Sequence, residues 1–345
     1  MNRLQLIVLI LICHRASFAQ IGGSQSLDFT NTAVNAGVFA IGGVDVSHRD
    51  LDNNHFWQNP ASLDTGFNNF ISYNYNANYA DIQNHTLSYT KSKEKLGNFA
   101  FGISFWNYGE MQETDENGNE IGEFRASDLI LNIGYGRRFD NFSYGLNLKI
   151  ANSSIASFNS TALLFDLGGQ FIHPKEDFVI GMVFRNIGMP LSKYTSDTEF
   201  VLPFDLRIGS SYKPKHMPLR FSATLHRLYR YDIVYDDPNL FTGFDENGEP
   251  IREEPGTLDK LTRHLIIGTE LLITKGFNIQ AGYNFMRRAE LQIVERKALV
   301  GFSFGMLLKV KSVQFALARS VDHISGATTK LTLTSDLNFI TKNRI

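Results

Sequence analysis

The chain has 345 residues and a formal net charge of −2, so its overall charge predicts no nucleic-acid partner. Its one cysteine, Cys13, excludes a small domain held together by disulfides. The mean hydropathy is -0.16, yet the chain contains 28 Phe and 13 Tyr. Average polarity with abundant aromatic residues is typical of a transmembrane β-barrel, in which half of each strand faces lipid and half faces the interior.

Residues 1–19 have the form of a secretory signal peptide. One positive charge, Arg3, precedes an apolar run over 4–12 that only Gln5 interrupts. Ser17-Phe18-Ala19 then places small residues where a signal peptidase needs them, so the mature chain is expected to begin at Gln20. The apolar run is too short for a membrane-spanning helix, which needs about 20 residues.

The strongest pattern downstream is an alternation of period two. In the stretch 277–285 every second residue is apolar, and 99–105, 142–150 and 331–339 repeat the pattern. Such segments form strands with one oily and one polar or small face. We therefore predict an all-β fold, a transmembrane antiparallel barrel of about fourteen strands. The expected strands are 67–75, 84–92, 98–108, 126–138, 142–152, 160–173, 177–187, 204–213, 218–229, 261–273, 276–288, 297–308, 311–320 and 329–339.

The lengths of the connections support the barrel independently. Short links such as 139–141 and 274–275 alternate with generally longer ones such as 109–125 and 230–260. Outer-membrane barrels have short periplasmic turns and longer external loops, whereas nothing in a soluble β-sandwich or solenoid requires this alternation. The rule predicts an outer-membrane location in a Gram-negative bacterium, with both termini in the periplasm.

The two faces of one strand give a testable expectation. Leu148 should face lipid and Asn147 the lumen, so Leu148→Arg should damage assembly far more than Asn147→Arg.

Residues 20–66 do not follow the strand pattern. Small residues lead to Gly42 and Gly43, a polar run follows, and the segment then reaches Asn59-Pro60-Ala61. Because fourteen strands enclose more space than wall side chains fill, we predict a plug inside the barrel. A flexible periplasmic lead-in is the alternative. The expected organisation is a signal peptide over 1–19, a plug or hatch segment over 20–66 and the barrel over 67–345.

Several stretches resemble known families. The glycine pair and Asn59-Pro60-Ala61 resemble the hatch of barrels related to long-chain fatty-acid transporters. The stretches 124–135, 184–188 and 225–238 are similar to the PorQ family, which belongs to the type IX secretion system of Bacteroidetes. The similarity covers essentially the whole chain, and 225–238 is its most specific part.

This resemblance implies an outer-membrane anchor and scaffold of the attachment complex. The anchor would hold a soluble surface protein of the PorZ type beside the sortase-like protease PorU and the barrel PorV, among outer-membrane lipid and lipopolysaccharide. The alternative function is an outer-membrane transporter of hydrophobic small molecules. The family supplies no catalytic residue and no cofactor, and we expect no enzyme and no metal centre. His226, on the polar face of its predicted strand, is interpreted as a hydrated lumen residue rather than a catalytic one.

The predicted external loops carry many carboxylates. Loop 230–260 is the longest link, and such long loops are usually functional or disordered. We predict that this loop docks the partner. The alternatives are that its carboxylates repel anionic lipopolysaccharide, as a charged shield, or that they bridge calcium ions. Neither acidic loop has EF-hand spacing. The predicted partner-binding residues are Tyr235, Asp236, Asp237, Phe241, Asp245, Glu246, Glu253 and Glu254.

Overall fold

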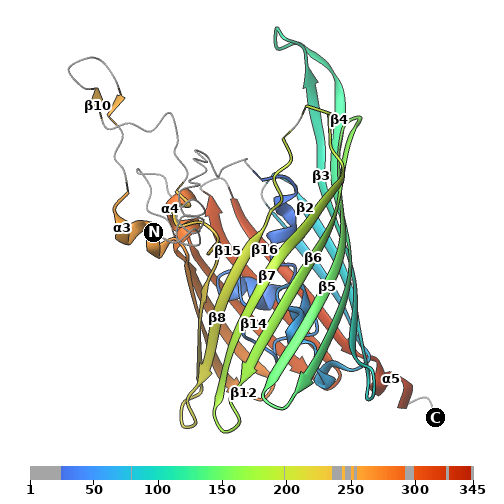
Figure 1. Cartoon of the computed structure of the whole chain (residues 1–345), viewed down its shortest axis with the longest axis vertical. Coiled ribbons are helices and arrows are strands. Elements are labelled where there is room, and N and C mark those ends of the chain that lie inside the picture. Colours follow the sequence, from blue (N-terminus) through green and yellow to red (C-terminus); the bar gives the residue numbers. More distant parts are fainter. Residues whose placement is uncertain are drawn as a thin grey trace, which may run out of the picture.

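The predicted barrel is present. The computed structural model describes residues 25–78, 80–197, 199–234, 243–244, 250–251, 255–291, 299–323 and 326–342, and within them fourteen antiparallel strands close into one barrel (Figure 1). Each strand pairs with its neighbours in the chain, and β1 closes the barrel against β16. The strands are β1 (Phe70–Ala77), β2 (Gln83–Lys93), β3 (Gly97–Thr114), β4 (Glu120–Phe139), β5 (Phe142–Ile155), β6 (Phe158–Ile172), β7 (Asp177–Ser192), β8 (Asp205–Lys213), β9 (Leu219–Leu225), β12 (Leu265–Thr274), β13 (Phe277–Asn284), β14 (Phe302–Val310), β15 (Val313–His323) and β16 (Gly326–Asp336). A separate two-stranded pair is formed by β10 (Gly243–Phe244) and β11 (Pro250–Ile251).

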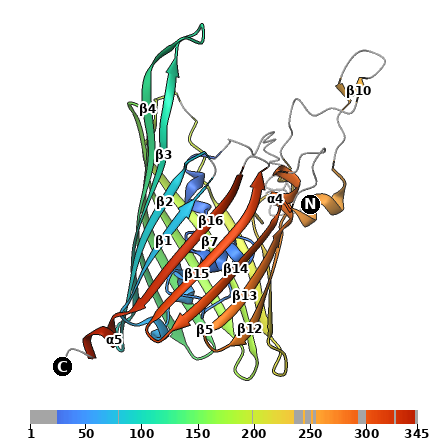
Figure 2. The ribbon, with the colours of Figure 1, turned by 180° about the vertical axis from the view of Figure 1, so that it is seen from behind.

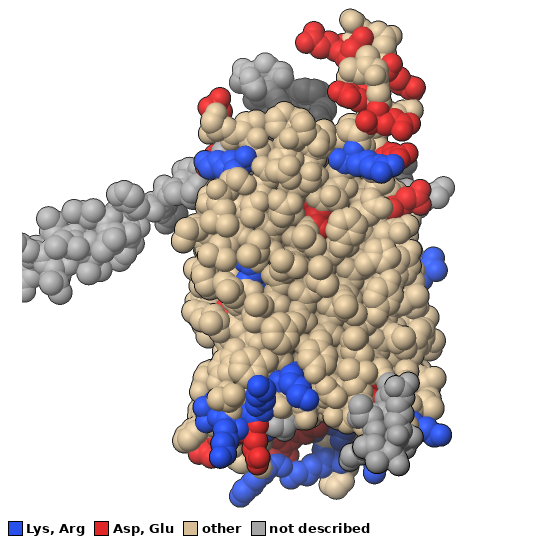
Figure 3. Space-filling model, turned by 90° about the vertical axis from the view of Figure 1, so that its right-hand side faces the viewer, with Lys and Arg blue, Asp and Glu red and all other residues tan. Residues whose placement is uncertain are grey.

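The outer face of the barrel is an apolar belt. Along β5 the residues alternate between buried and exposed, with Asn147 at 0% and Leu148 at 38% exposure. Figure 3 shows uncharged residues over the middle of the wall and charged residues gathered toward its two ends. Closed barrels of this kind span membranes because every backbone group is paired and the apolar side chains contact lipid.

The first described residues lie inside this barrel (Figures 1 and 2). The segment from residue 25 to residue 69, here called the N-terminal segment, contains short helices separated by turns. These helices are η1 (Asp28–Asn31), α2 (Ala36–Ala40), η2 (His55–Trp57), η3 (Pro60–Ser62) and η4 (Thr65–Phe67). None of the helices in the described part of the chain is long and apolar enough to span a membrane.

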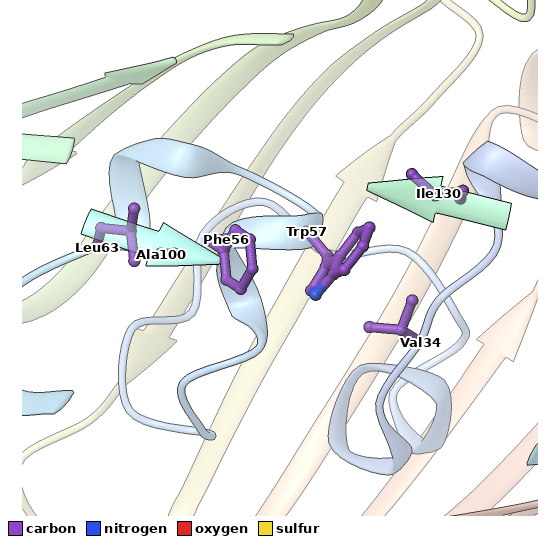
Figure 4. Packing of buried hydrophobic residues seen from close by; sticks show 6 residues of the cluster. All are labelled: Val34, Phe56, Trp57, Leu63, Ala100 and Ile130. Atoms are coloured by element: carbon purple, nitrogen blue, oxygen red, sulfur yellow. The ribbon is translucent and has the colours of Figure 1, made fainter. Parts of the chain in front are cut away.

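Apolar side chains fix part of this segment to the wall. Phe56 and Trp57 pack with Val34 and Leu63 against Ala100 of β3 and Ile130 of β4 (Figure 4). The indole Nε1 of Trp57 also donates a hydrogen bond of 2.9 Å to the hydroxyl of Ser88 on β2.

Glycines on the inward face of the wall allow the close approach of the segment. A β-carbon at Gly145 would lie 2.3 Å from the carbonyl carbon of Pro60, and one at Gly282 would lie 2.2 Å from the backbone nitrogen of Gly42. These distances are shorter than any real contact, so side chains at these positions would prevent the segment from fitting. The small residues on the polar faces of the strands therefore form the surface of the wall against which the N-terminal segment packs.

The inward position of Asn147 is confirmed, but the reason for expecting an arginine to be mild there, a water-filled lumen, is wrong. Its amide nitrogen donates to the carbonyl oxygen of Phe56 at 2.8 Å and to the carboxylate of Asp166 at 3.1 Å. The lumen at this level is packed protein rather than water, so an arginine has no space there.

Three predicted strands end earlier than expected, and helices follow two of them. β9 ends at Leu225, α4 (Phe285–Leu291) follows β13, and α5 (Leu337–Lys342) follows β16. The side chain of Asn284 accepts a hydrogen bond from the backbone nitrogen of Arg287 at 2.9 Å, which is the geometry of a helix N-cap. Asp336 likewise accepts from the backbone nitrogen of Asn338. Helix capping by Asn284 and Asp336 therefore ends these two strands, although the alternation of apolar and polar residues continues in the sequence beyond each of them.

The two ends of the barrel differ as the link lengths predict. The long links lie at one end, called here the long-link end, and the short turns at the other, the short-turn end (Figure 1). Gln25, the first described residue, bonds Tyr229 at the long-link end, while α5 lies at the short-turn end (Figure 2). The described chain thus begins and ends at opposite ends of the barrel, whereas both termini were expected on the same side. The signal peptide and Gln20 lie outside the described residues, and the side of the membrane that each end faces stays a prediction.

Candidate functional site

A cavity of about 450 Å³ lies at the long-link end of the barrel. It is bounded by the N-terminal segment, the ends of β8 and β9, and the junction of β13 with α4. Its lining residues are Asp28, Asn31, Thr32, Ala33, Phe39, Gly43, Val44, Asp205, Arg207, His226, Arg227, Asn284, Met286, Arg287, Glu290 and Leu291. The lining thus combines apolar side chains with cationic, anionic and hydrogen-bonding groups.

Part of the cavity wall is an ion pair on β8. The Nε of Arg207 donates to Asp205 Oδ2 at 2.5 Å, and its Nη1 donates to Gln58 of the N-terminal segment at 2.8 Å. The other oxygen of Asp205 accepts from the backbone nitrogen of Arg227 at 2.6 Å. Because both members are almost fully buried, the pair holds the segment, β8 and the chain after β9 in fixed positions.

His226 lines this cavity directly after the end of β9. Its backbone nitrogen donates to the carbonyl oxygen of His264 at 3.0 Å, and its own carbonyl oxygen lies 2.8 Å from His264 Nδ1. Burial lowers the pKa of His226 to about 3, so its ring is neutral at physiological pH. Its Nε2 has no hydrogen-bond partner within the described residues. His226 is therefore a buried cavity residue, and its expected place on a hydrated strand face is wrong.

Arg227 brings a positive charge to the cavity. Its φ angle of 54° is left-handed, a conformation uncommon for a residue other than glycine. The turn takes the chain off the line of β9 at the point where the strand ends. Within the described residues, no hydrogen bond or ion pair engages its guanidinium group. The Arg227 side chain is half-buried, and strained backbone of this kind is concentrated at functional sites in proteins.

The apolar side of the cavity comes from α2 and α4. Phe39, Met286 and Leu291 line it, and the guanidinium of Arg287 lies 5.1 Å from the centre of the Phe39 ring. Burial raises the pKa of Glu290, the carboxyl group that α4 contributes to the lining. The cavity therefore suits a molecule with one apolar part and one polar or anionic part.

The sequence-predicted plug residues are all in the N-terminal segment. Gly42 and Gly43 have φ angles of 108° and 89°, and Gly43 lines the cavity. The carbonyl oxygen of Gly42 accepts from Asn284 at 3.2 Å. Asn59 caps η3 by accepting from the backbone nitrogen of Ala61 at 3.0 Å, and Pro60 is the first residue of that turn.

The predicted partner-binding residues lie outside the described residues. This holds for all eight of them, Tyr235, Asp236, Asp237, Phe241, Asp245, Glu246, Glu253 and Glu254. Their assignment to a docking surface stays a prediction.

Much of the predicted loop 109–125 is instead strand. β3 and β4 pair from Glu110 with Arg125 to Thr114 with Glu120, beyond the reach of their neighbours β2 and β5. This part, called here the acidic ribbon (residues 109–125), projects past the barrel (Figures 1 and 3). Its carboxylates are Glu110, Glu113, Asp115, Glu116, Glu120 and Glu123. Among the described residues, no group of three or more His, Cys, Asp or Glu side chains is arranged so that it could hold a metal ion.

Sequence reasoning missed the cavity because its walls come from distant parts of the chain. Both His226 and Arg227 belong to the stretch 225–238, which the sequence marks only by its family resemblance, and His226 alone was interpreted further, as a lumen residue. The one sequence signal that pointed to the cavity was local. Basic residues and a histidine follow the point where the alternation of β9 stops.

Comparisons with known proteins bear on the fold. No protein-family model matches the chain, and no curated protein matches its sequence. Among solved structures, the Pseudomonas putida toluene transporter TodX is similar, with 13% identity, a TM-score of 0.56, and coverage of 89% of this chain and 99% of that one. The TodX deltaS2 mutant, described as a monoaromatic hydrocarbon channel, gives 14% identity, a TM-score of 0.51, and coverage of 88% and 98%. The chain thus has the fold of these bacterial barrels.

Proposed function

We propose that this protein is an outer-membrane transporter that admits a small amphipathic molecule through the cavity at its long-link end. The cavity is the observation that carries the proposal, because it combines apolar walls with Arg227, whose guanidinium no hydrogen bond or ion pair engages within the described residues. The barrel fold shared with a toluene transporter supports this function. In this proposal the long-link end faces the cell exterior, as the rule that outer-membrane barrels have longer external loops predicts.

The route below the cavity is closed by the N-terminal segment. Phe39 and Gly43 belong to both the segment and the cavity lining, so a bound molecule rests against the segment itself. Passage to the periplasm therefore requires the segment to move, and in this proposal it acts as a plug.

The charge of Arg227 is expected to select the ligand. Octanoate and octanol have the same chain length and differ in the charged group, so the wild type should bind octanoate more tightly. Arg227→Gln should weaken octanoate binding by about tenfold or more, since a hydrogen bond to a charged group contributes about 1.5–3 kcal/mol. Calorimetric titration of the protein in amphipol measures both affinities.

Arg125→Gln is the matched control, because Arg125 lies on the acidic ribbon and pairs with Glu110. It should leave both affinities unchanged. Absence of octanoate binding to the wild type, or an equal loss in both arginine variants, would count against the cavity as the entry site.

A second candidate function is the anchor and scaffold that the resemblance to PorQ implies. The acidic ribbon is the observation that favours it. An isolated two-stranded ribbon is only marginally stable in water, and no other described strand pairs with either edge of this one. Carboxylates outnumber basic residues along it, so a soluble partner with a basic surface, of the PorZ type near PorU and PorV, would cover it.

Two deletions separate the possible docking surfaces. Joining Tyr108 to Ala126 through Asn-Gly removes the acidic ribbon at a hairpin register the strands already have. Replacing 240–256 with a Gly/Ser linker shortens the predicted docking loop. If the ribbon is the dock, the first variant should fold and release the partner into the medium, while the second retains it. The reverse pattern would assign the dock to loop 230–260, and retention by both would exclude the anchor function at these two sites. Fractionation of intact cells measures the release.

A further inference from the structure

A cluster of buried charges joins the N-terminal segment to one sector of the wall. The ring of His48 lies between two carboxylates, with Nε2 3.0 Å from Glu270 of β12 and Nδ1 3.0 Å from Asp45 of its own segment. The approach to Asp45 is poorly directed for a hydrogen bond, but its distance is that of an ion pair. All three residues are at most 2% exposed. Because both nitrogens face carboxylates, the doubly protonated imidazolium form fits this site.

On the barrel wall, the cluster of charges extends from Glu270 through Arg220 toward the short-turn end. Arg220 of β9 donates to Glu270 at 3.2 Å and makes two parallel hydrogen bonds, of 2.7 and 2.8 Å, to the carboxylate of Asp50. It also lies 3.4 Å from Asp177 at the start of β7. Asp50 belongs to the N-terminal segment, and its side chain is 61% exposed. The segment is therefore bonded to the wall through two adjacent ion pairs, one buried and one reached by solvent.

Glu270 is the residue on which the cluster converges. Its two oxygens accept from Gln280 of β13 at 2.8 Å and from Arg220, and they face the ring of His48. Three donors thus meet one carboxylate. A glutamine would offer one acceptor oxygen and an NH₂ group that opposes at least one of these donors. Two cations would then remain buried with less compensation.

We infer that Asp45, His48, Asp50, Arg220 and Glu270, here called the latch cluster, form a latch that keeps the N-terminal segment in the barrel and whose opening frees a water-filled path. A buried ion pair is costly to desolvate and stabilises a structure only while every partner is in place. Removal of one charged side chain therefore weakens the whole contact between the N-terminal segment and the wall. The rest of the wall remains a closed barrel, since its strands pair independently of the segment. The inference concerns the closure of the barrel and holds whether or not the cavity binds octanoate.

Glu270→Gln is expected to open the barrel. In planar bilayers the full-length wild type should show almost no conductance steps, and the variant should raise the open fraction by on the order of a hundredfold. A second readout is trypsin cleavage after Arg49, whose guanidinium is held by Asp64 and Gln170 in the closed protein. In liposomes the variant should be cut there and the wild type should not. Glu113→Gln removes an equal charge from the acidic ribbon and should behave as the wild type.

The double variant Glu270→Gln with His48→Gln decides whether pairing or charge alone is responsible. Two neutral amides can bond to each other, so the double variant should close the barrel again and restore resistance to trypsin. Folding is checked by the shift of the unboiled band on a gel. A folded Glu270→Gln protein that neither conducts nor is cleaved would show that the segment is a fixed core and would overturn the latch. If Glu270→Gln fails to fold and the double variant does not rescue it, the cluster is a folding determinant and the inference also fails.

Discussion

Replacement of Gly145 by valine is expected to prevent the N-terminal segment from seating in the barrel. A β-carbon there would lie 2.3 Å from the carbonyl carbon of Pro60 and 2.7 Å from the backbone nitrogen of Ala61. Backbone atoms of η3 cannot rotate aside as the end of a long side chain can, so the whole turn must move. Overpacking of this kind costs about 1–3 kcal/mol, and the midpoint of urea unfolding should fall accordingly.

Gly169→Val is the matched control for this substitution. Gly169 lies on the adjacent strand β6, opposite Tyr144, and a β-carbon there would have no atom within 4 Å. Valine is favourable in strands, so this variant should be as stable as the wild type or slightly more stable. Equal unfolding midpoints for the two valine variants would mean that the segment does not pack against β5 in the membrane.

Leu148→Arg is expected to be the most damaging substitution on the outer face. Leu148 points outward from the middle of β5, so the arginine would lie near the centre of the bilayer and cost about 2–4 kcal/mol. Phe142→Arg is the depth control. It is on the same face of the same strand but at the short-turn end, where the cost falls to about 0–1 kcal/mol.

The measurement is the fraction of folded protein after refolding into lipid vesicles. If both arginines are equally harmful, the apolar belt is not centred on the middle of β5. Asn147→Arg should also fail, but through its packing against Phe56 and Asp166 rather than through lipid. Its failure should therefore persist in detergent, where a charge at position 148 can recruit water.

The barrel was predictable from the sequence because the cause of its pattern is local. Successive side chains on a strand point to opposite faces, so the alternation in 142–150 records which residues meet lipid. Every predicted strand corresponds to one in the barrel, although 276–288 and 329–339 run past the true strand ends. Those ends were missed because one capping residue, Asn284 or Asp336, stops a strand without interrupting the alternation.

Only part of the structure of the acidic ribbon could be predicted from the sequence. Asn117-Gly118 is a residue pair typical of tight hairpin turns, and Gly118 has the left-handed φ angle of 83° that such turns need. The flanking residues were nevertheless interpreted as a loop, because charged residues on both faces give no alternation of hydrophobicity. Their strand conformation comes from pairing with each other beyond the membrane.

The sequence by itself determined the fold class, the two faces of each strand and the alternation of link lengths, since each depends on neighbouring residues. Tertiary structure alone decided the cavity and the latch cluster. His48 meets Glu270 across 222 positions, and the cavity joins Asp28 to Leu291. No local pattern encodes such a meeting. The N-terminal segment meets these partners inside the closed barrel, where small wall residues such as Gly145 and Gly282 leave it space.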